Sequence, residues 1–152
     1  MALHSLARDQ AVNRPQAQVF DFFAAAENLA RVTPAKLGFE FVEPPPDRFD
    51  VGVEVHYRIH INGIPVNWIS RIIEWDPPRR FADLQIKGPY HRWTHTHIFD
   101  PDGDSRTIIR DRVQYEVPLG PLGEVARLLF VERQLKAIFD FRAQAFGEAL
   151  GV

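Results

Sequence analysis

From residue 38 to residue 117 the sequence alternates apolar and polar side chains, in short runs that turn-forming residues divide. A period of two is typical of β-strands that bury one face. The pair Asn62-Gly63 between two such runs is a strong hairpin signal, because both residues tolerate the positive φ of a type I′ turn. Six strands are predicted, over 38–43, 51–61, 64–75, 80–86, 91–99 and 105–117. Sequential hairpins of this kind form an antiparallel meander.

The sequence on either side of this meander predicts one more strand and three helices. Residues 2–12 predict the strand, and Pro15 then opens a helix at a position where its missing N–H costs nothing. A second short helix is predicted over 27–33, before Pro34. Residues 121–148 predict one long helix. Its recurring stripe consists of Leu128, Val131, Leu135, Ile138 and Arg142.

These elements predict the fold class α+β. We expect a curved antiparallel sheet of about seven strands wrapped around the long C-terminal helix, with two short helices after the first strand. By length, residues 1–152 form a single domain. A curved sheet around a long helix leaves a space between them unless large side chains fill it.

Composition excludes several classes of protein. The chain has no cysteine, so disulfides and thiolate zinc sites are excluded. The net charge of −2 gives no electrostatic basis for binding nucleic acid. There is no apolar run of the ~20 residues that span a bilayer, and the N-terminus lacks the apolar core of a secretory signal. We therefore expect a cytoplasmic protein with no nucleic-acid partner and no transmembrane segment, and a homodimer stays open.

The order of elements resembles the START-like, or SRPBCC, helix-grip superfamily. The nearer likeness is to small bacterial polyketide cyclase/dehydrase-type ligand-binding proteins. It rests on Pro15 with Val19-Phe20 and Phe23, Glu27-Asn28-Leu29, Thr33-Pro34, Trp68, the run FADLQIKGPYHRWTHTHIF, Asp111 with Tyr115 and Pro118, and Ile138-Phe139 with Arg142. The resemblance covers essentially the whole chain and implies neither a metal nor a cofactor. It leaves the reaction open, because the fold carries binders, transporters and enzymes alike.

The alternation also predicts which side chains face the interior. In the last run, Asp111 and Tyr115 share one face with apolar residues, whereas three arginines share the other face. The first face is therefore the buried one, and Asp111 points inward.

The hairpin between 91–99 and 105–117 sets the neighbours of Asp111. If Phe99 pairs with Ser105, the histidine-rich strand lies beside Asp111. The side chains then expected to face inward are His91, Trp93, His95, His97 and Phe99. A shift of one residue would reverse this assignment.

The strand over 80–86 is assigned through the turn at Gly88-Pro89. Pairing Ile86 with His91 gives its phase. The side chains expected beside Trp93 and His95 are Ala82, Leu84 and Ile86.

The strand over 64–75 has two incompatible predictions. Counting from Asn62-Gly63 puts Trp68 on the inner face, whereas counting back from the turn at 76–79 puts Arg71 there. Both hold only with a bulge or an altered loop, so the facing of Arg71 stays open.

Three chemical roles are compatible with this cluster of histidines. A metal site would use His91, His95 and His97 with Asp111, because histidines two apart on a strand can reach one zinc ion. An acid–base site would use His95 or His97 for proton transfer and Asp111 to orient the imidazole. A structural pair would satisfy Asp111 with one histidine and carry no chemistry. We expect no metal.

The function predicted is binding of a small hydrophobic molecule, such as a lipid, quinone or polyketide-like compound, in a cavity between the sheet and the C-terminal helix. The expected ligand-binding residues are Tyr57, Trp68, Trp93, His95, His97, Asp111, Tyr115, Leu135 and Phe139. One alternative is a cofactor-free cyclase or dehydratase that uses His95 or His97 with Asp111. A second is a protein-interaction module without a ligand, which would show a filled core and an exposed apolar patch on the 121–148 helix.

Overall fold

The computed structural model describes residues 2–150, and within them seven strands form one antiparallel sheet in the order β1-β7-β6-β5-β4-β3-β2. The strands are β1 (His4–Val12), β2 (Glu40–Phe41), β3 (Glu54–Ile61), β4 (Ile64–Asp76), β5 (Arg80–Lys87), β6 (Arg92–Pro101) and β7 (Thr107–Glu116). The helices are α1 (Gln16–Ala24), α2 (Asn28–Arg31), the 3-10 helix η1 (Ala35–Leu37), α3 (Gly120–Ala126), the π-helix η2 (Arg127–Val131) and α4 (Glu132–Leu150). The predicted α+β helix-grip fold is confirmed.

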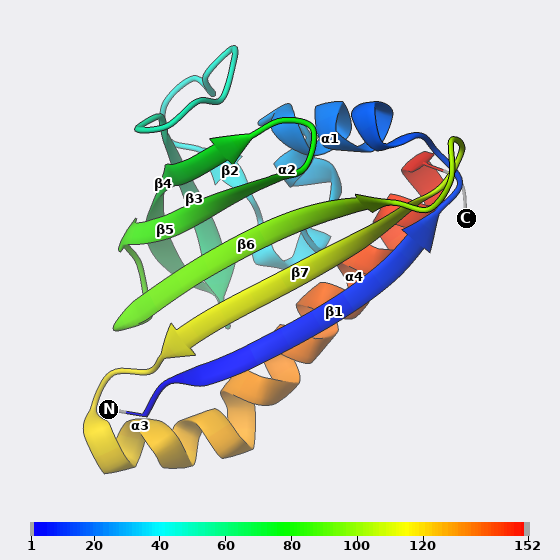
Figure 1. Ribbon diagram of the computed structural model, residues 1–152. Coiled ribbons are helices and arrows are strands. Elements are labelled where there is room, and N and C mark those ends of the chain that lie inside the picture. Colours follow the sequence, from blue (N-terminus) through cyan, green and yellow to red (C-terminus); the bar gives the residue numbers. More distant parts are fainter. Residues whose placement is uncertain (1, 151–152) are drawn as a thin grey trace.

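The sheet curves around the C-terminal helix, as Figure 1 shows. In this view α4 crosses the sheet beside β7 and β1, and its C-terminal end approaches α1, while α3 lies at the opposite end of the sheet. None of the helices within residues 2–150 combines the length and the apolarity that a membrane span requires.

The Asn62-Gly63 hairpin sets the phase of the first half of β4. Both residues have positive φ, 51° and 80°, as a type I′ turn requires, and the turn places Trp68 opposite Tyr57. Two register shifts later in β4 re-phase the strand where it pairs with β5, which resolves the conflict between the two predictions. Arg71 therefore lies on the outer face, where its Nη2 lies 2.7 Å from a carboxylate oxygen of Glu54.

The prediction for the inner face of β5 is wrong by one residue. Asp83 lies opposite His95, so the odd-numbered residues of β5 face inward and Ile86 is exposed. The connection to β6 is longer than a tight turn, and the Gln85 side chain occupies it by donating to the Tyr90 carbonyl at 2.8 Å. Because this side chain takes the place of a backbone hydrogen bond between the strands, counting alternate residues across the turn does not give the correct partners.

The inner face of β6 is predicted with the correct phase, although the register is not. Phe99 lies opposite Ile109 instead of Ser105, a change of four residues in its partner, because the strands stay paired as far as Pro101 and Thr107 and the turn follows two residues later than expected. An even shift leaves every side chain on the predicted face. His91 is the exception: it precedes β6 and its side chain is 53% exposed, so the prediction that it faces inward is wrong.

The C-terminal helix runs without a break from Gly120 to Leu150, close to the predicted 121–148. Its predicted stripe fails at Leu128, which is 62% exposed, while Leu135 is buried. Leu128 lies within the π-helical turn η2, whose wider i→i+5 hydrogen bonding rotates α4 relative to α3. A single 3.6-residue period therefore cannot describe both halves of the helix.

The apolar core consists of two clusters at the two ends of the sheet. The first surrounds Phe20, Phe81, Phe99 and Phe146, where α1 meets the end of α4. The second contains Trp68, Trp93, Val113, Tyr115, Leu135 and Phe139.

Phe99→Ala should destabilise the protein by about 3–5 kcal/mol, because it empties the centre of the first cluster. Phe99 is fully buried, and its ring centroid lies 5.2 Å from that of Phe23 and 5.5 Å from that of Phe20. The free energy of unfolding from urea titration measures the loss. Phe141→Ala on α4 is the matched control, since Phe141 is 38% exposed, and a similar loss in both variants would contradict this account of the core.

Candidate functional site

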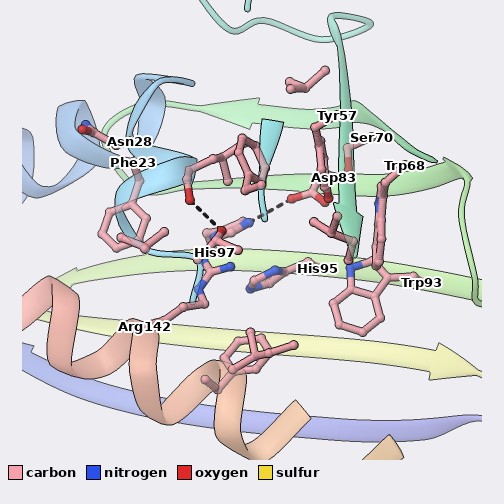
Figure 2. Close-up of a pocket in the computed structure, with 18 of the residues that line it drawn as sticks. Phe23, Asn28, Tyr57, Trp68, Ser70, Asp83, Trp93, His95, His97 and Arg142 are labelled. Atoms are coloured by element: carbon pink, nitrogen blue, oxygen red, sulfur yellow. Dashed lines mark hydrogen bonds and ion pairs between the residues drawn. The ribbon is translucent and has the colours of Figure 1, made fainter. Parts of the chain in front are cut away.

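A cavity of about 160 Å³ lies between the sheet and α4, and Figure 2 shows a close-up of it. Its wall is mostly aromatic and aliphatic, with side chains from α1, α2, α4 and strands β3 to β6. Predicted site residues that line it are Tyr57, Trp68, Trp93, His95, His97, Leu135 and Phe139. The other two predicted residues, Asp111 and Tyr115, are buried in the sheet but do not line the cavity.

Polar side chains cross the inner face of the protein between the two apolar clusters. On β6, His95 and His97 lie between Trp93 and Phe99, and on β4 Ser70 lies between Trp68 and Ile72. We call this set the polar belt; it consists of Tyr57, Ser70, Asp83, His95, His97, Asp111 and Arg142. The cavity therefore has polar groups at its middle and apolar walls toward both ends.

Two histidine–carboxylate pairs form the centre of the belt. His95 Nε2 lies 2.8 Å from Asp111 Oδ1, and His97 Nε2 lies 2.9 Å from Asp83 Oδ2. The pairs cross, because each histidine contacts the carboxylate diagonal to it on a neighbouring strand. The two imidazole rings stack with centroids 3.8 Å apart and planes inclined by 23°.

Three residues of the belt, Ser70, Asp83 and Arg142, line the cavity but are absent from the predicted site, and of these Asp83 was expected on the opposite face. The predicted pairing of Ile86 with His91 assigned it to the outer face, whereas the observed pairing of Leu84 with Thr94 puts it on the inner face. A usable signal was present, since Asp83 is the only acidic residue of β5 and stands between Ala82 and Leu84. A carboxylate within an apolar strand needs a partner, and inward-facing histidines on the adjacent strand supply one.

Burial and pairing fix the charges of the belt. Burial, with His95 close by, lowers the pKa of His97 to about 4, although Asp83 and Asp111 act in the opposite direction. Burial tends to raise the pKa of Asp111, but the hydrogen bond from His95 and the nearby positive charges outweigh it and lower that pKa to about 2. Burial and the hydrogen bond from His97 act in the same opposed way on Asp83, with a net lowering of its pKa. At neutral pH both carboxylates are ionised and His97 is neutral.

The arrangement favours hydrogen bonding over metal coordination. His91 does not face the interior and cannot contribute to a metal site there. Within the described residues, the atoms that could bind a metal ion belong to Asp83, His95 and His97, and they lie within 4.8 Å of one another. The lone pairs of an imidazole lie in the plane of its ring. Because the two rings are stacked, these lone pairs run in nearly parallel planes instead of converging on one point, as a tetrahedral site requires.

Three buried nitrogen atoms have no hydrogen-bond partner within residues 2–150: Trp68 Nε1, His97 Nδ1 and Arg142 Nε. All three residues line the cavity. Figure 2 shows Arg142 reaching from α4 toward His97 and His95. Since buried polar groups are normally paired, these atoms mark where a bound molecule could complete the hydrogen bonding.

Tyr115 has a different environment from the one predicted. It packs in the second cluster, with its ring centroid 5.6 Å from that of His4 on β1. Burial raises the pKa of its hydroxyl, against the opposing effect of the Arg127 guanidinium on η2. Tyr115 therefore packs at the end of the sheet that η2 covers and does not line the cavity.

Acidification should reduce the free energy of unfolding between about pH 6.5 and pH 4. As the pH falls through the usual histidine pKa of about 6.5, the unfolded chain binds a proton at His97. The folded protein binds that proton only near pH 4, the lowered pKa. The unfolded state therefore binds more protons across this window, and stability falls by about 3 kcal/mol. Asp111 adds a further loss below its usual pKa of 3.8, down to about 2.

Urea titrations at a series of pH values measure this dependence. His97→Gln should flatten the slope between pH 6.5 and pH 4, because glutamine does not titrate and its amide can still donate to Asp83. His91→Gln is the matched control, and with a half-exposed ring it should keep the slope. Equal slopes in the two variants would show that His97 does not titrate as described.

Known structures share the fold at low sequence identity. A START superfamily protein from Mycobacterium smegmatis is 14% identical, with a TM-score of 0.73 and 97% of each chain covered. Norcoclaurine synthase from Thalictrum flavum, in a complex with a transition-state analogue, is 15% identical, with a TM-score of 0.69 and coverage of 97% of this chain and 96% of that one. The Zhui aromatase/cyclase of a Streptomyces species is 15% identical, with a TM-score of 0.67 and the same coverage. At these identities the likeness establishes the fold alone.

No curated protein matches the sequence. A family model does match, over residues 4–151, and its description is polyketide cyclase/dehydrase and lipid transport. The match spans nearly the whole chain and agrees with the START-like fold. The chain therefore belongs to the polyketide cyclase/dehydrase and lipid transport family.

Proposed function

We propose that the protein binds a small hydrophobic molecule, of lipid, quinone or polyketide type, in the cavity between its sheet and α4. The observation that carries this proposal is the cavity itself, which stays open between two well-filled apolar clusters. Small-molecule sites are typically apolar clefts with a few convergent polar groups, and the polar belt supplies such groups. The family and the fold support a ligand-binding or cyclase role in general terms.

The volume bears on the size of the molecule. An apolar cavity of about 150 Å³ is sufficient for a benzene ring, and this one measures about 160 Å³. A flat molecule of one or two rings therefore suits the cavity as it stands, and a longer chain has to displace wall side chains. Burial of the ligand would contribute about 25 cal/mol per Å² of apolar surface removed from water.

Leu135→Trp should abolish ligand retention, because the larger side chain fills the cavity from α4. Native mass spectrometry of freshly purified protein, followed by organic extraction, reads out any bound compound. Leu128→Trp on η2 is the matched control, since Leu128 is largely exposed and should leave retention unchanged. Equal retention by both variants would place the bound compound elsewhere.

Acid–base catalysis is the second candidate function, and the histidine–carboxylate pairs favour it. An ionised Asp83 accepts from His97 Nε2, which leaves the neutral ring able to take up a proton. The cavity would hold a bound carbonyl compound close to this base, among apolar side chains. Enolisation, in which a proton moves from a carbon next to the carbonyl to an imidazole nitrogen, is the simplest reaction that such a site supports.

Deuterium exchange in D2O measures enolisation without knowledge of the natural substrate. The methyl protons of 2-acetylnaphthalene should exchange faster with the protein than in buffer, as NMR detects. His97→Gln and His95→Gln should reduce this rate to near the buffer value while the ketone still binds. Binding without any acceleration of exchange would leave the protein a binder and remove the catalytic candidate.

The protein-interaction alternative accounts for only part of the structure. The apolar patch that it requires is present on the helical end, at Leu119, Leu122, Val125, Leu128, Leu129 and Phe130. The filled core that it also requires is not, because the cavity lies between the clusters. An interaction surface would therefore accompany ligand binding and not replace it.

A further inference from the structure

Besides its two histidines, the polar belt brings two carboxylates and one guanidinium to the cavity. Asp83 lines the wall directly, and Asp111 lies behind His95 at 2.8 Å. Both carboxylates are ionised at neutral pH, and the carboxylate of Asp83 is held by a neutral His97. Besides the histidines that pair with them, the Arg142 guanidinium is the positive group of the belt that acts on both carboxylates.

Arg142 is positioned to contact a ligand. Its guanidinium carbon lies 5.3 Å from the centroid of Phe139 and 5.5 Å from that of Phe146, so aromatic rings fix it at the belt. Its Nε is buried and has no acceptor in the part of the chain that the structure describes. A guanidinium only donates hydrogen bonds, so the missing partner is an acceptor oxygen or nitrogen.

The charge of that acceptor is restricted by the carboxylates. A ligand carboxylate would become a third anion beside Asp83 and Asp111, in a cavity where low polarity makes like-charge repulsion strong. A protonated amine has no acceptor to offer and would meet the charge of Arg142. A neutral carbonyl or hydroxyl oxygen accepts from Arg142 and adds no charge.

We propose that the cavity selects neutral ligands whose carbonyl or hydroxyl oxygen accepts a hydrogen bond from Arg142, and that Asp83 excludes carboxylates. This inference rests on the proposed function and narrows it. Ketones, quinones and sterol-like alcohols meet the requirement, whereas free fatty acids and aromatic acids do not. Asp83 then acts as a specificity-determining residue in addition to pairing with His97.

Two probe pairs of matched shape test the selection at pH 7 by calorimetric titration. The aromatic pair is 2-acetylnaphthalene and 2-naphthoate, and the aliphatic pair is 2-nonanone and octanoate. In each pair the ketone should bind at least about tenfold more tightly than the carboxylate, the size of effect expected from one unfavourable charge contact. Arg142→Met should weaken binding of both ketones about tenfold, by loss of a charged donor.

Asp83→Asn separates charge from shape. The amide keeps the size of the side chain and removes one negative charge, so carboxylate binding should improve about tenfold relative to the ketone. Asp140→Asn is the matched control: Asp140 pairs with Arg8 and Lys136 outside the cavity, and its substitution should leave the ratio unchanged.

The possible outcomes are distinct. Carboxylates that bind as tightly as ketones to the wild-type protein overturn the charge selection and leave the binding function standing. An unchanged ratio in a folded Asp83→Asn variant overturns the role of Asp83. If neither member of either pair binds, both the selection and the binding function fall. The wild-type comparison decides the selection even if the variant does not fold.

Discussion

The inner face of the sheet contains two ionised carboxylates away from water, and this is possible because each one accepts a hydrogen bond from a histidine of β6. Asp83 and Asp111 come from β5 and β7, so the two pairs join three adjacent strands. A one-residue slip of β6 would turn both histidines outward and leave two buried charges unpaired, at a cost of several kcal/mol. The pairs therefore specify the register at the centre of the sheet.

The same belt explains why the interior is not filled. Large side chains pack on either side of it, with Phe99 at one end of β6 and Trp93 at the other. Apolar side chains packed directly over the belt would shield its charged and polar atoms without offering them hydrogen bonds. The space at the middle of the sheet, under Arg142 and Phe139 of α4, is thus a consequence of the polar belt. A curved sheet and a long helix provide the room, and the belt keeps it open.

The sequence was sufficient for the elements and for the faces of most strands, and it failed where a connection departs from simple counting. The period-two pattern predicted correctly which side chains of β6 and β7 face inward, despite an error in the register of the two strands. The faces were unaffected because the error was an even number of residues. The pattern failed for β5, where the Gln85 side chain replaces ladder hydrogen bonds, and so Asp83 was missed. The 3.6-residue period likewise failed at Leu128, because no residue type signals the π-turn that re-phases the helix. The crossed pairing of histidines and carboxylates depends on all of these phases together.

Stability alone is a weak reason for such a belt. Well-packed apolar residues in place of buried charged pairs are often neutral or even stabilising, by about 1–4 kcal/mol in measured cases. Here the belt also leaves Trp68 Nε1, His97 Nδ1 and Arg142 Nε buried without partners within the described residues, which adds a further cost. A sheet of this length could align its strands with apolar pairs and turns. The charged groups are thus better explained by a molecule that binds between the sheet and α4, whose polar atom meets the donors that the protein leaves open.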